Sequence, residues 1–219
     1  MALPAASANE RRMMVDCQLR TYDITDRAVL AAFGAVPREA FVAPGAAGFA
    51  YADRDVPALG RPDRVVIAPM VLARMIQALL IAPGARALDV AGGAGYGAAI
   101  LRELGAAVTA IESAWPAAAV APLAGERGGN VCIEGDIAKG WPANAPYDAI
   151  LLHGAIEAEP GALIAQLRDG GRLVCGESTG EWGRIVSYER LGSSFRKRNV
   201  VDAQLPALAE FAAKPVFVF

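Results

Sequence analysis

Apolar and polar positions change period along the chain, and this change predicts an α/β fold. Short apolar runs recur after residue 85 and predict strands at 86–90, 107–112, 130–134, 148–153 and 171–176. Helical patterns alternate with these runs, at 95–104, 115–124, 137–140 and 160–168. Strands separated by helices are typical of βαβ units, so we expect a mostly parallel sheet.

The first third of the chain is expected to be a helical cap. Helical spacing of apolar residues extends over 9–44, and Thr25 is placed to cap a helix over 26–36. A connection rich in Gly, Pro and Asp follows at 44–69, and the sequence leaves open whether it forms a lid. A proline in the first turn then begins a helix over 69–80.

The C-terminal pattern differs from the middle of the chain. Three further strands, without helices between them, are expected at 185–189, 195–201 and 216–219. They predict an antiparallel edge on the parallel sheet. We therefore divide the chain into a cap with a substrate-side loop, 1–69, and a Rossmann-like core, 70–219, which together form one compact unit.

The composition of the chain limits which partners it can bind and in which cell compartment we expect it. The chain has 219 residues, enough for one α/β domain, and a net charge of −2, which argues against a nucleic-acid partner. No apolar run is long enough for a membrane span, and the first residues do not resemble a secretory signal. Three dispersed cysteines and one histidine, His153, provide no metal-ligand set and fit a reducing cytoplasm. We expect a monomer.

The segment 89–95, Asp-Val-Ala-Gly-Gly-Ala-Gly, connects an expected strand to an expected helix. A tight glycine turn at this place brings backbone N–H groups close to a nucleotide-like ligand. One interpretation is a dinucleotide fingerprint over Gly93, Gly95 and Ala98. The other is an S-adenosylmethionine motif in which Ala91 replaces the first glycine.

Carboxylates in register with this turn favour S-adenosylmethionine. Glu112 ends the second strand, where it could accept hydrogen bonds from ribose hydroxyls in either interpretation. Asp136 and Ile137 follow the third strand, where such enzymes commonly contact adenine, and Asp89 is placed to face the methionine part. No Tyr-x-x-x-Lys pair is present to assist hydride transfer, which disfavours NAD. The simpler alternatives are an ordinary turn, solvated strand ends and an Asx turn at Asp136.

Two further features have a functional and a simpler interpretation. His153 ends the fourth strand and could act as a general base toward a hydroxyl acceptor, or it could be a strand-end histidine bonded to water or backbone. The basic run Arg196-Lys197-Arg198 could bind phosphate or nucleic acid. A solvated hairpin tip is favoured, because no aromatic platform or wider basic stripe accompanies it.

Short motifs in order along the chain are similar to those of one enzyme family. They are Val36-Pro37-Arg38, Tyr51-Ala52-Asp53-Arg54, the loop from Asp89 to Tyr96, Pro146-Tyr147-Asp148-Ala149-Ile150 and the Leu-Arg-Asp-Gly-Gly-Arg-Leu run at 167–173. Together they resemble the protein-L-isoaspartate O-methyltransferase family. The resemblance implies a Rossmann-like methyltransferase fold, S-adenosylmethionine as cofactor and methylation of a protein or peptide carboxyl group.

The chain departs from the family's pattern on the acceptor side. The family signature is Gln-Thr-Ile-Ser-x-Pro, and here Pro69 is retained while Ile67 stands at the position of the active-site serine. Met70 stands where the family often has an aromatic residue or histidine. The resemblance implies that Asp53, Ile67, Pro69 and Met70 border the acceptor. The alternative to an active enzyme is an S-adenosylmethionine-binding homologue that is catalytically silent or methylates another acceptor, such as a small molecule.

Overall fold

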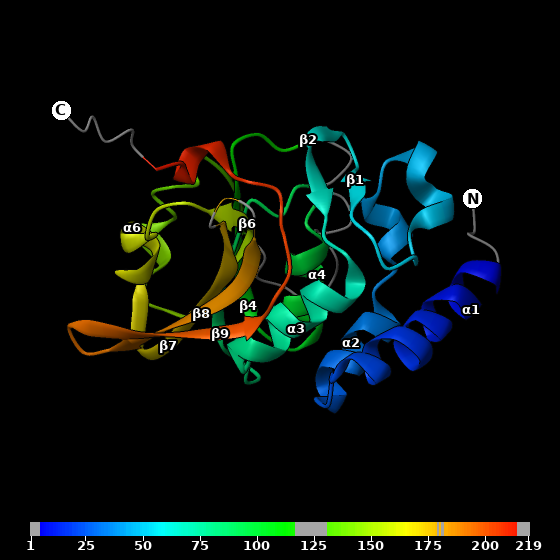
Figure 1. Cartoon of the computed structure of the whole chain (residues 1–219), viewed down its shortest axis with the longest axis horizontal. Helices are drawn as coiled ribbons and strands as arrows, with labels where there is room; N and C mark the ends of the chain where they lie inside the picture. The colour runs from blue at the N-terminus through cyan, green and yellow to red at the C-terminus, as the bar shows by residue number, and fades with distance from the viewer. Residues whose placement is uncertain (1–4, 117–130, 179, 181, 214–219) are drawn as a thin grey trace.

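The computed structural model describes residues 5–116, 131–178, 180 and 182–213 of the chain. Its centre is a seven-stranded sheet with the order β5-β4-β3-β6-β7-β8-β9 (Figure 1). The strands are β3 (Arg86–Val90), β4 (Ala107–Glu112), β5 (Val131–Glu134), β6 (Tyr147–Ile156), β7 (Leu167–Ser178), β8 (Gly183–Leu191) and β9 (Ser194–Val201). The pairs from β5 to β7 are parallel, and β7-β8-β9 are antiparallel. The expected Rossmann-like sheet with an antiparallel C-terminal edge is confirmed; the strand expected at 216–219 lies outside the described residues.

Helices form the predicted N-terminal cap and flank the sheet. They are α1 (Ala5–Met14), α2 (Arg27–Ala35), α3 (Pro69–Leu79), α4 (Tyr96–Glu103) and α6 (Gly161–Ile164), with a π-helical turn at Val15–Leu19 and 3₁₀ turns at Arg20–Tyr22, Arg38–Phe41, Pro44–Phe49, Pro142–Asn144 and Ala209–Phe211. Figure 1 shows α1 and α2 at one end of the molecule and α3 between them and the sheet. No described helix combines the length and apolarity that a membrane crossing requires.

The start of α2 differs from the prediction by one residue. Asp26, not Thr25, is the N-cap: its Oδ1 accepts hydrogen bonds from the amides of Ala28 at 2.8 Å and Val29 at 3.3 Å. The Thr25 amide instead donates to Oε1 of Gln77 in α3, at 2.9 Å. The same Gln77 oxygen accepts from the Asp26 amide, so the beginning of α2 is attached to α3.

The connection at 44–69 contains a β-hairpin that the sequence analysis did not predict. Its strands are β1 (Val56–Ala58) and β2 (Arg61–Val66), and Gly60 turns the chain with φ +65°. Prolines at positions 57 and 62 interrupt the strand pattern, so the sequence did not predict these two strands. A proline is tolerated here because this two-stranded sheet consists of edge strands.

Two expected helices are wrong in length or type. The helix expected over 160–168 ends at Ile164, and β7 already begins at Leu167, opposite Tyr147. The segment expected to be helical over 137–140 is a turn. The helix expected over 115–124 falls mostly on residues outside those described.

Two buried hydrophobic clusters lie on the two faces of the sheet. Alternate residues of the same strand belong to different clusters, as Ala87 and Leu88 do in β3. The first cluster also contains Phe33 of α2 and Leu72 and Met75 of α3, so it joins cap and sheet. The parallel strands are buried on both faces, which explains why they appear as continuous apolar runs.

Candidate active site

The segment between β3 and α4 is a tight glycine turn, as the sequence predicted. Gly93 has φ +61° and Gly95, which precedes α4, has φ +87°. Ala91 has φ +58°, a left-handed conformation that costs a non-glycine residue about 1 kcal/mol. Ala91 therefore adopts a backbone conformation that favours glycine, as expected of a residue that replaces the first glycine of the motif.

Asp89 and His153 form a buried pair beneath this turn. Nε2 of His153 lies 2.6 Å from Oδ1 of Asp89, and the side chains are 4% and 0% exposed. A Cβ on Gly92 would lie 2.3 Å from Oδ2 of Asp89, and one on Gly97 would lie 2.4 Å from Cε1 of His153. The pair thus occupies space that only glycines leave free. Oδ2 of Asp89 is buried and has no hydrogen-bond partner within the described part of the chain.

Glu112 ends β4 as a fully buried carboxylate surrounded by donors. It accepts the Gly93 amide at 3.0 Å and the Ser113 amide at 2.8 Å. It also pairs with Nη1 of Arg61 at 3.3 Å and Nη2 of Arg64 at 3.2 Å. The predicted ribose carboxylate therefore links the glycine turn to the hairpin.

The hairpin lies directly on the glycine turn. A Cβ on Gly93 would be 3.0 Å from Cβ of Ala58 in β1 and 3.1 Å from Cβ of Arg64 in β2. Arg64 also contacts Oε1 of Glu210, at 3.1 Å. Neither Arg61 nor Arg64 was among the predicted site residues, because their partners are far away in the sequence. The available signal was that two arginines lie three residues apart in the short segment before α3.

The expected acceptor-side residues come together at the start of α3. Pro69 is the first residue of the helix, and the Met70 amide donates to Oδ1 of Asp53 at 3.1 Å. Asp53 thus caps the helix from the preceding loop. Ile67 is 1% exposed, and its apolar side chain belongs to the first buried cluster.

Arg38 is a buried cation that organises this region. Its Nε donates to the carbonyl of Ala50 at 2.6 Å, and its Nη atoms donate to the carbonyls of Ile67 at 2.8 Å and Val66 at 3.1 Å. The guanidinium lies 5.3 Å from the ring centroid of Tyr96 in α4. Burial lowers the pKa of Arg38. The sequence showed Arg38 only as part of a family motif, and its organising role was missed.

Asp136 and Ile137 occupy different environments after β5. Asp136 is exposed, its Oδ1 accepts the Ala138 amide at 3.0 Å, and its Oδ2 pairs with Lys139 at 3.1 Å. The hydrogen bond from Lys139 lowers the pKa of the Asp136 carboxyl. Ile137 is buried in the second cluster, which also contains Ala91. The structure brings Ile137, but not the Asp136 carboxylate, into the packed layer behind the turn.

Comparison with known proteins identifies the family. A family model described as protein-L-isoaspartate(D-aspartate) O-methyltransferase matches residues 9–203. The chain belongs to this family. The match covers the cap, the hairpin, the glycine turn and the sheet together.

Similar proteins have the same family name. A protein-L-isoaspartate O-methyltransferase from Methanoregula boonei is 41% identical over 203 residues, covering 91% of this chain and 93% of that protein. One from Methylorubrum extorquens is 46% identical over 170 residues, covering 76% of this chain and 73% of the relative.

Solved structures show the same fold. One protein-L-isoaspartate O-methyltransferase superposes with a TM-score of 0.77 at 19% identity, covering 92% of this chain and 67% of that chain. A Plasmodium falciparum structure named for the same enzyme, in complex with S-adenosyl-L-homocysteine, has a TM-score of 0.76 at 17% identity. It covers 92% of this chain and 98% of the other.

Proposed function

We propose that the chain is an S-adenosylmethionine-dependent O-methyltransferase that methylates a carboxyl group of a protein or peptide, with isoaspartyl residues as the acceptor class. The main observation is the arrangement of Asp89, the glycine turn and Glu112 at the carboxyl ends of adjacent parallel strands. This is where open α/β sheets bind nucleotide-like ligands. Family membership and the S-adenosyl-L-homocysteine complex of the Plasmodium relative support the choice of cofactor.

The residues present fit this cofactor. Oδ2 of Asp89 is a buried acceptor with no partner among the described residues, and a bound ligand could supply the missing donor. The turn that contains Ala91, Gly93 and Gly95 would approach the cofactor, and Glu112 would hold its ribose hydroxyls. Asp136 and Ile137 would flank the adenine end. Arg64 already pairs with Glu112, so the ribose hydroxyls can bind this carboxylate only by displacing the Arg64 guanidinium.

Methyl transfer to a carboxylate requires little proton chemistry from the protein. S-adenosylmethionine supplies an activated methyl group, and a carboxyl acceptor is already ionised at neutral pH because its pKa is near 4. The chain therefore has to orient the acceptor and exclude water. The hairpin over the turn and the apolar side chain of Ile67 are suited to excluding water. Asp53 and Pro69 fix the start of α3 beside them.

His153 is proposed to act by positioning Asp89. Its Nε2 is hydrogen-bonded to Asp89 and its side chain is 4% exposed, which supports this role over that of a base facing the acceptor. A positioning role predicts that His153→Gln raises the KM for S-adenosylmethionine more than it lowers kcat. A base would instead give a kcat that follows the ionisation of an imidazole, and the variant would remove that pH dependence.

We also propose a protein or peptide partner, a cytoplasmic location and a monomeric state. All three cysteines, Cys17, Cys132 and Cys175, are free thiols, which supports a reducing compartment. Light scattering on the purified chain tests the monomer, and detection of the protein in fractionated cells tests the compartment.

A transfer assay tests the proposed activity. The full chain is incubated with methyl-labelled S-adenosylmethionine and either an isoaspartyl peptide or the matched aspartyl peptide. We expect base-labile label on the isoaspartyl peptide alone, because a methyl ester hydrolyses in base. Cofactor binding without transfer would contradict isoaspartyl activity and favour the silent homologue or another acceptor. If Ile67→Ser then created activity, only the acceptor contact would have been lost.

A further inference from the structure

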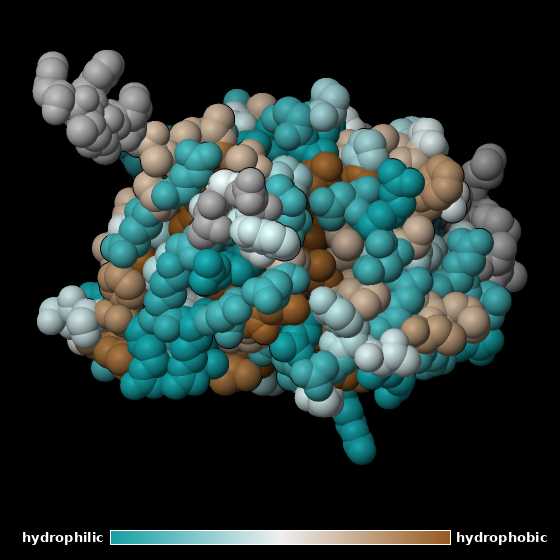
Figure 2. All heavy atoms as spheres, viewed as in Figure 1, coloured by the Kyte–Doolittle hydropathy of each residue, from teal (hydrophilic) through white to brown (hydrophobic). Residues whose placement is uncertain are grey.

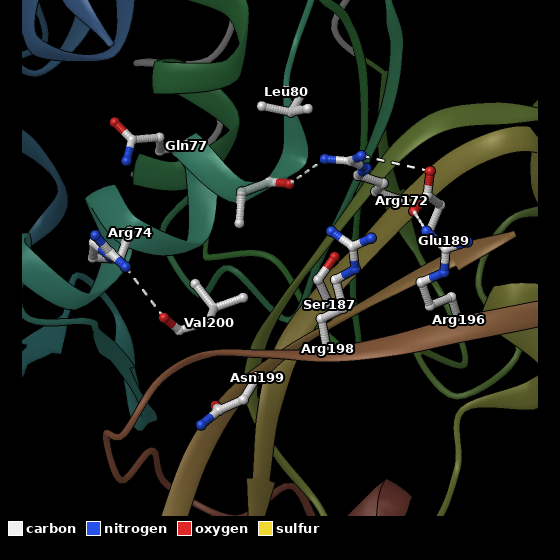
Figure 3. A pocket seen from close by; sticks show the side chains of 11 residues that line it. Arg74, Gln77, Leu80, Arg172, Ser187, Glu189, Arg196, Arg198, Asn199 and Val200 are labelled. Carbon is white, nitrogen blue, oxygen red and sulfur yellow. Dashed lines mark hydrogen bonds and ion pairs between the residues drawn. The ribbon is translucent and has the colours of Figure 1, made fainter. Parts of the chain in front are cut away.

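A cavity of about 350 Å³ lies between the C-terminal half of α3 and the face of β7, β8 and β9 (Figure 3). Most of the residues that line it are of polar or charged types, and the full set is Arg74, Gln77, Ala78, Leu80, Arg172, Ser187, Glu189, Arg196, Arg198, Asn199 and Val200. Arg172 of β7 is opposite Ala149, in the N-terminal half of β6. The cavity therefore opens away from the carboxyl ends of the strands, where the glycine turn lies.

One row of charges across the strands is only partly neutralised. Arg172, Glu189 and Arg196 are cross-strand neighbours in β7, β8 and β9. Oε1 of Glu189 lies 3.5 Å from Arg172, and Oε2 lies 3.9 Å from Arg196. A single carboxylate is thus shared by two guanidinium groups, both at the long end of the ion-pair range.

The next cross-strand pair that lines the cavity, Ser187 and Arg198, contains a cation but no carboxylate. Arg198 of β9 is the cross-strand neighbour of Ser187, and no described residue forms a hydrogen bond or ion pair with the Arg198 side chain. Across the cavity, Arg74 of α3 is held by Asp23 at 2.5 Å and by the Val200 carbonyl at 3.2 Å. The Nε of Arg74 is buried and lacks an acceptor among the described residues.

We propose that this cavity binds a phosphate group, either free or carried by a small molecule. Guanidinium groups bind phosphate oxygens through paired, charge-assisted hydrogen bonds. Arg74 is already paired with Asp23, but the three arginines that line the cavity from the strands face a single carboxylate, Glu189. A phosphate beside Arg198 would supply the acceptors that this guanidinium lacks among the described residues. Ser187 adds a neutral donor to the same space, whereas the side-chain amide of Gln77 donates to the Asp23 carbonyl at 3.1 Å and that of Asn199 to Asp202 at 3.2 Å.

The basic run at 196–198 is exposed, as expected, but it lies within β9 and not at the hairpin tip. The tip of the β8–β9 hairpin lies at 191–194, and Arg196 and Arg198 line the cavity from within β9. Lys197 between them pairs with Glu177 instead. Figure 2 shows a mainly hydrophilic surface in this region, and the exposed apolar side chains of the hairpin are Leu191 and Phe195. Alternation along the strand thus separates two cavity arginines from a lysine with its own partner.

Calorimetric titration of the full chain at low ionic strength tests the proposal. The probes are inorganic phosphate, pyrophosphate and ribose 5-phosphate, with acetate as the monovalent control anion. We expect saturable 1:1 binding with a Kd below about 1 mM for at least one phosphate probe and none for acetate. Equal affinity for inorganic phosphate and the ester would assign the site to free phosphate. Tighter binding of the ester would assign it to a phosphorylated small molecule.

Two variants separate a specific site from general charge. Arg198→Gln removes an exposed cation without a partner in the described part of the chain, and we expect it to weaken binding at least about tenfold. Arg27→Gln removes the same charge from an exposed position at the start of α2 and should change the Kd less than about twofold. A side-chain NMR signal from Nε–H of Arg198 should shift on titration. Absence of saturable binding, or equal weakening by both variants, would overturn the proposal.

Discussion

Nη2 of Arg64 donates to Oε1 of Glu112 at 3.2 Å, so the hairpin's cation neutralises the carboxylate at the end of β4. Both side chains are shielded from solvent, with exposed fractions of 10% and 0%. An ion pair in such surroundings competes with any ligand that needs the same carboxylate. If Glu112 holds the cofactor ribose as proposed, cofactor affinity depends on the position of β2.

Replacing Arg64 should tighten cofactor binding. Arg64→Gln restores the residue of the family signature and removes the competing cation. We expect the Kd for S-adenosylhomocysteine to fall several-fold, equivalent to about 1 kcal/mol. Calorimetry measures it, and Arg64→Lys, which keeps the charge, should stay near the original affinity. Weaker binding by Arg64→Gln would mean that Arg64 itself contacts the cofactor.

A methyl group at Gly97 should destabilise the fold despite its position in α4. In an exposed helix interior, Gly→Ala stabilises by about 1 kcal/mol. Here the new Cβ would lie 2.4 Å from Cε1 of the buried His153, so we expect Gly97→Ala to lower the free energy of unfolding by about 1–3 kcal/mol.

A second variant, His153→Ala, shows whether the loss of stability comes from the contact between Gly97 and the histidine ring. In a His153→Ala background the two closest contacts, both with the ring, are absent, and only Oδ1 of Asp89 remains near the new Cβ, at 2.9 Å. Adding Gly97→Ala should therefore cost clearly less stability there than in the original chain. Urea unfolding of the four proteins in this cycle gives the coupling between Gly97 and His153. Additive effects would show that the ring does not occupy the space beside Gly97.

Truncating the buried Arg38 should be strongly destabilising. Arg38→Met keeps the apolar length of the side chain but leaves the carbonyls of Ala50, Val66 and Ile67 without their donor. We expect a loss of about 3 kcal/mol or more in the free energy of unfolding. Arg27→Met, at an exposed position, is the control and should change it by less than about 0.5 kcal/mol. Similar losses in both variants would refute the organising role of Arg38.

Acid should weaken the hairpin through Asp63. The hydrogen bond from Arg61 lowers the pKa of Asp63 to about 2. A depressed pKa contributes stability above the unfolded-state value near 4, and this contribution is lost as the pH falls through about 2. Its size is small because the Asp63 side chain is 56% exposed.

Comparison with an uncharged variant isolates this contribution. Unfolding of the original chain and of Asp63→Asn is followed between about pH 5 and pH 2. The stability difference should be largest at the upper end and shrink toward the lower end. A constant difference across the range would show that the Asp63 carboxylate is not stabilised by Arg61.

The sequence predicted the parallel strands well because they are buried on both faces and their apolar runs are continuous. It also identified Ala91 as a substituted glycine, and its φ of +58° agrees with that interpretation. The hairpin was missed because its strands are short and contain prolines. Arg64 and Arg38 were missed for another reason: their partners are far away in sequence, and only the folded chain brings them together.

The most direct test of the account is calorimetric titration of the full chain with S-adenosylmethionine and S-adenosylhomocysteine, with NAD as the comparison ligand. We predict saturable 1:1 binding of both S-adenosyl compounds in the micromolar range and no binding of NAD. Absence of binding by either S-adenosyl compound, or binding of NAD in their place, would contradict the cofactor site built from Asp89, the glycine turn and Glu112.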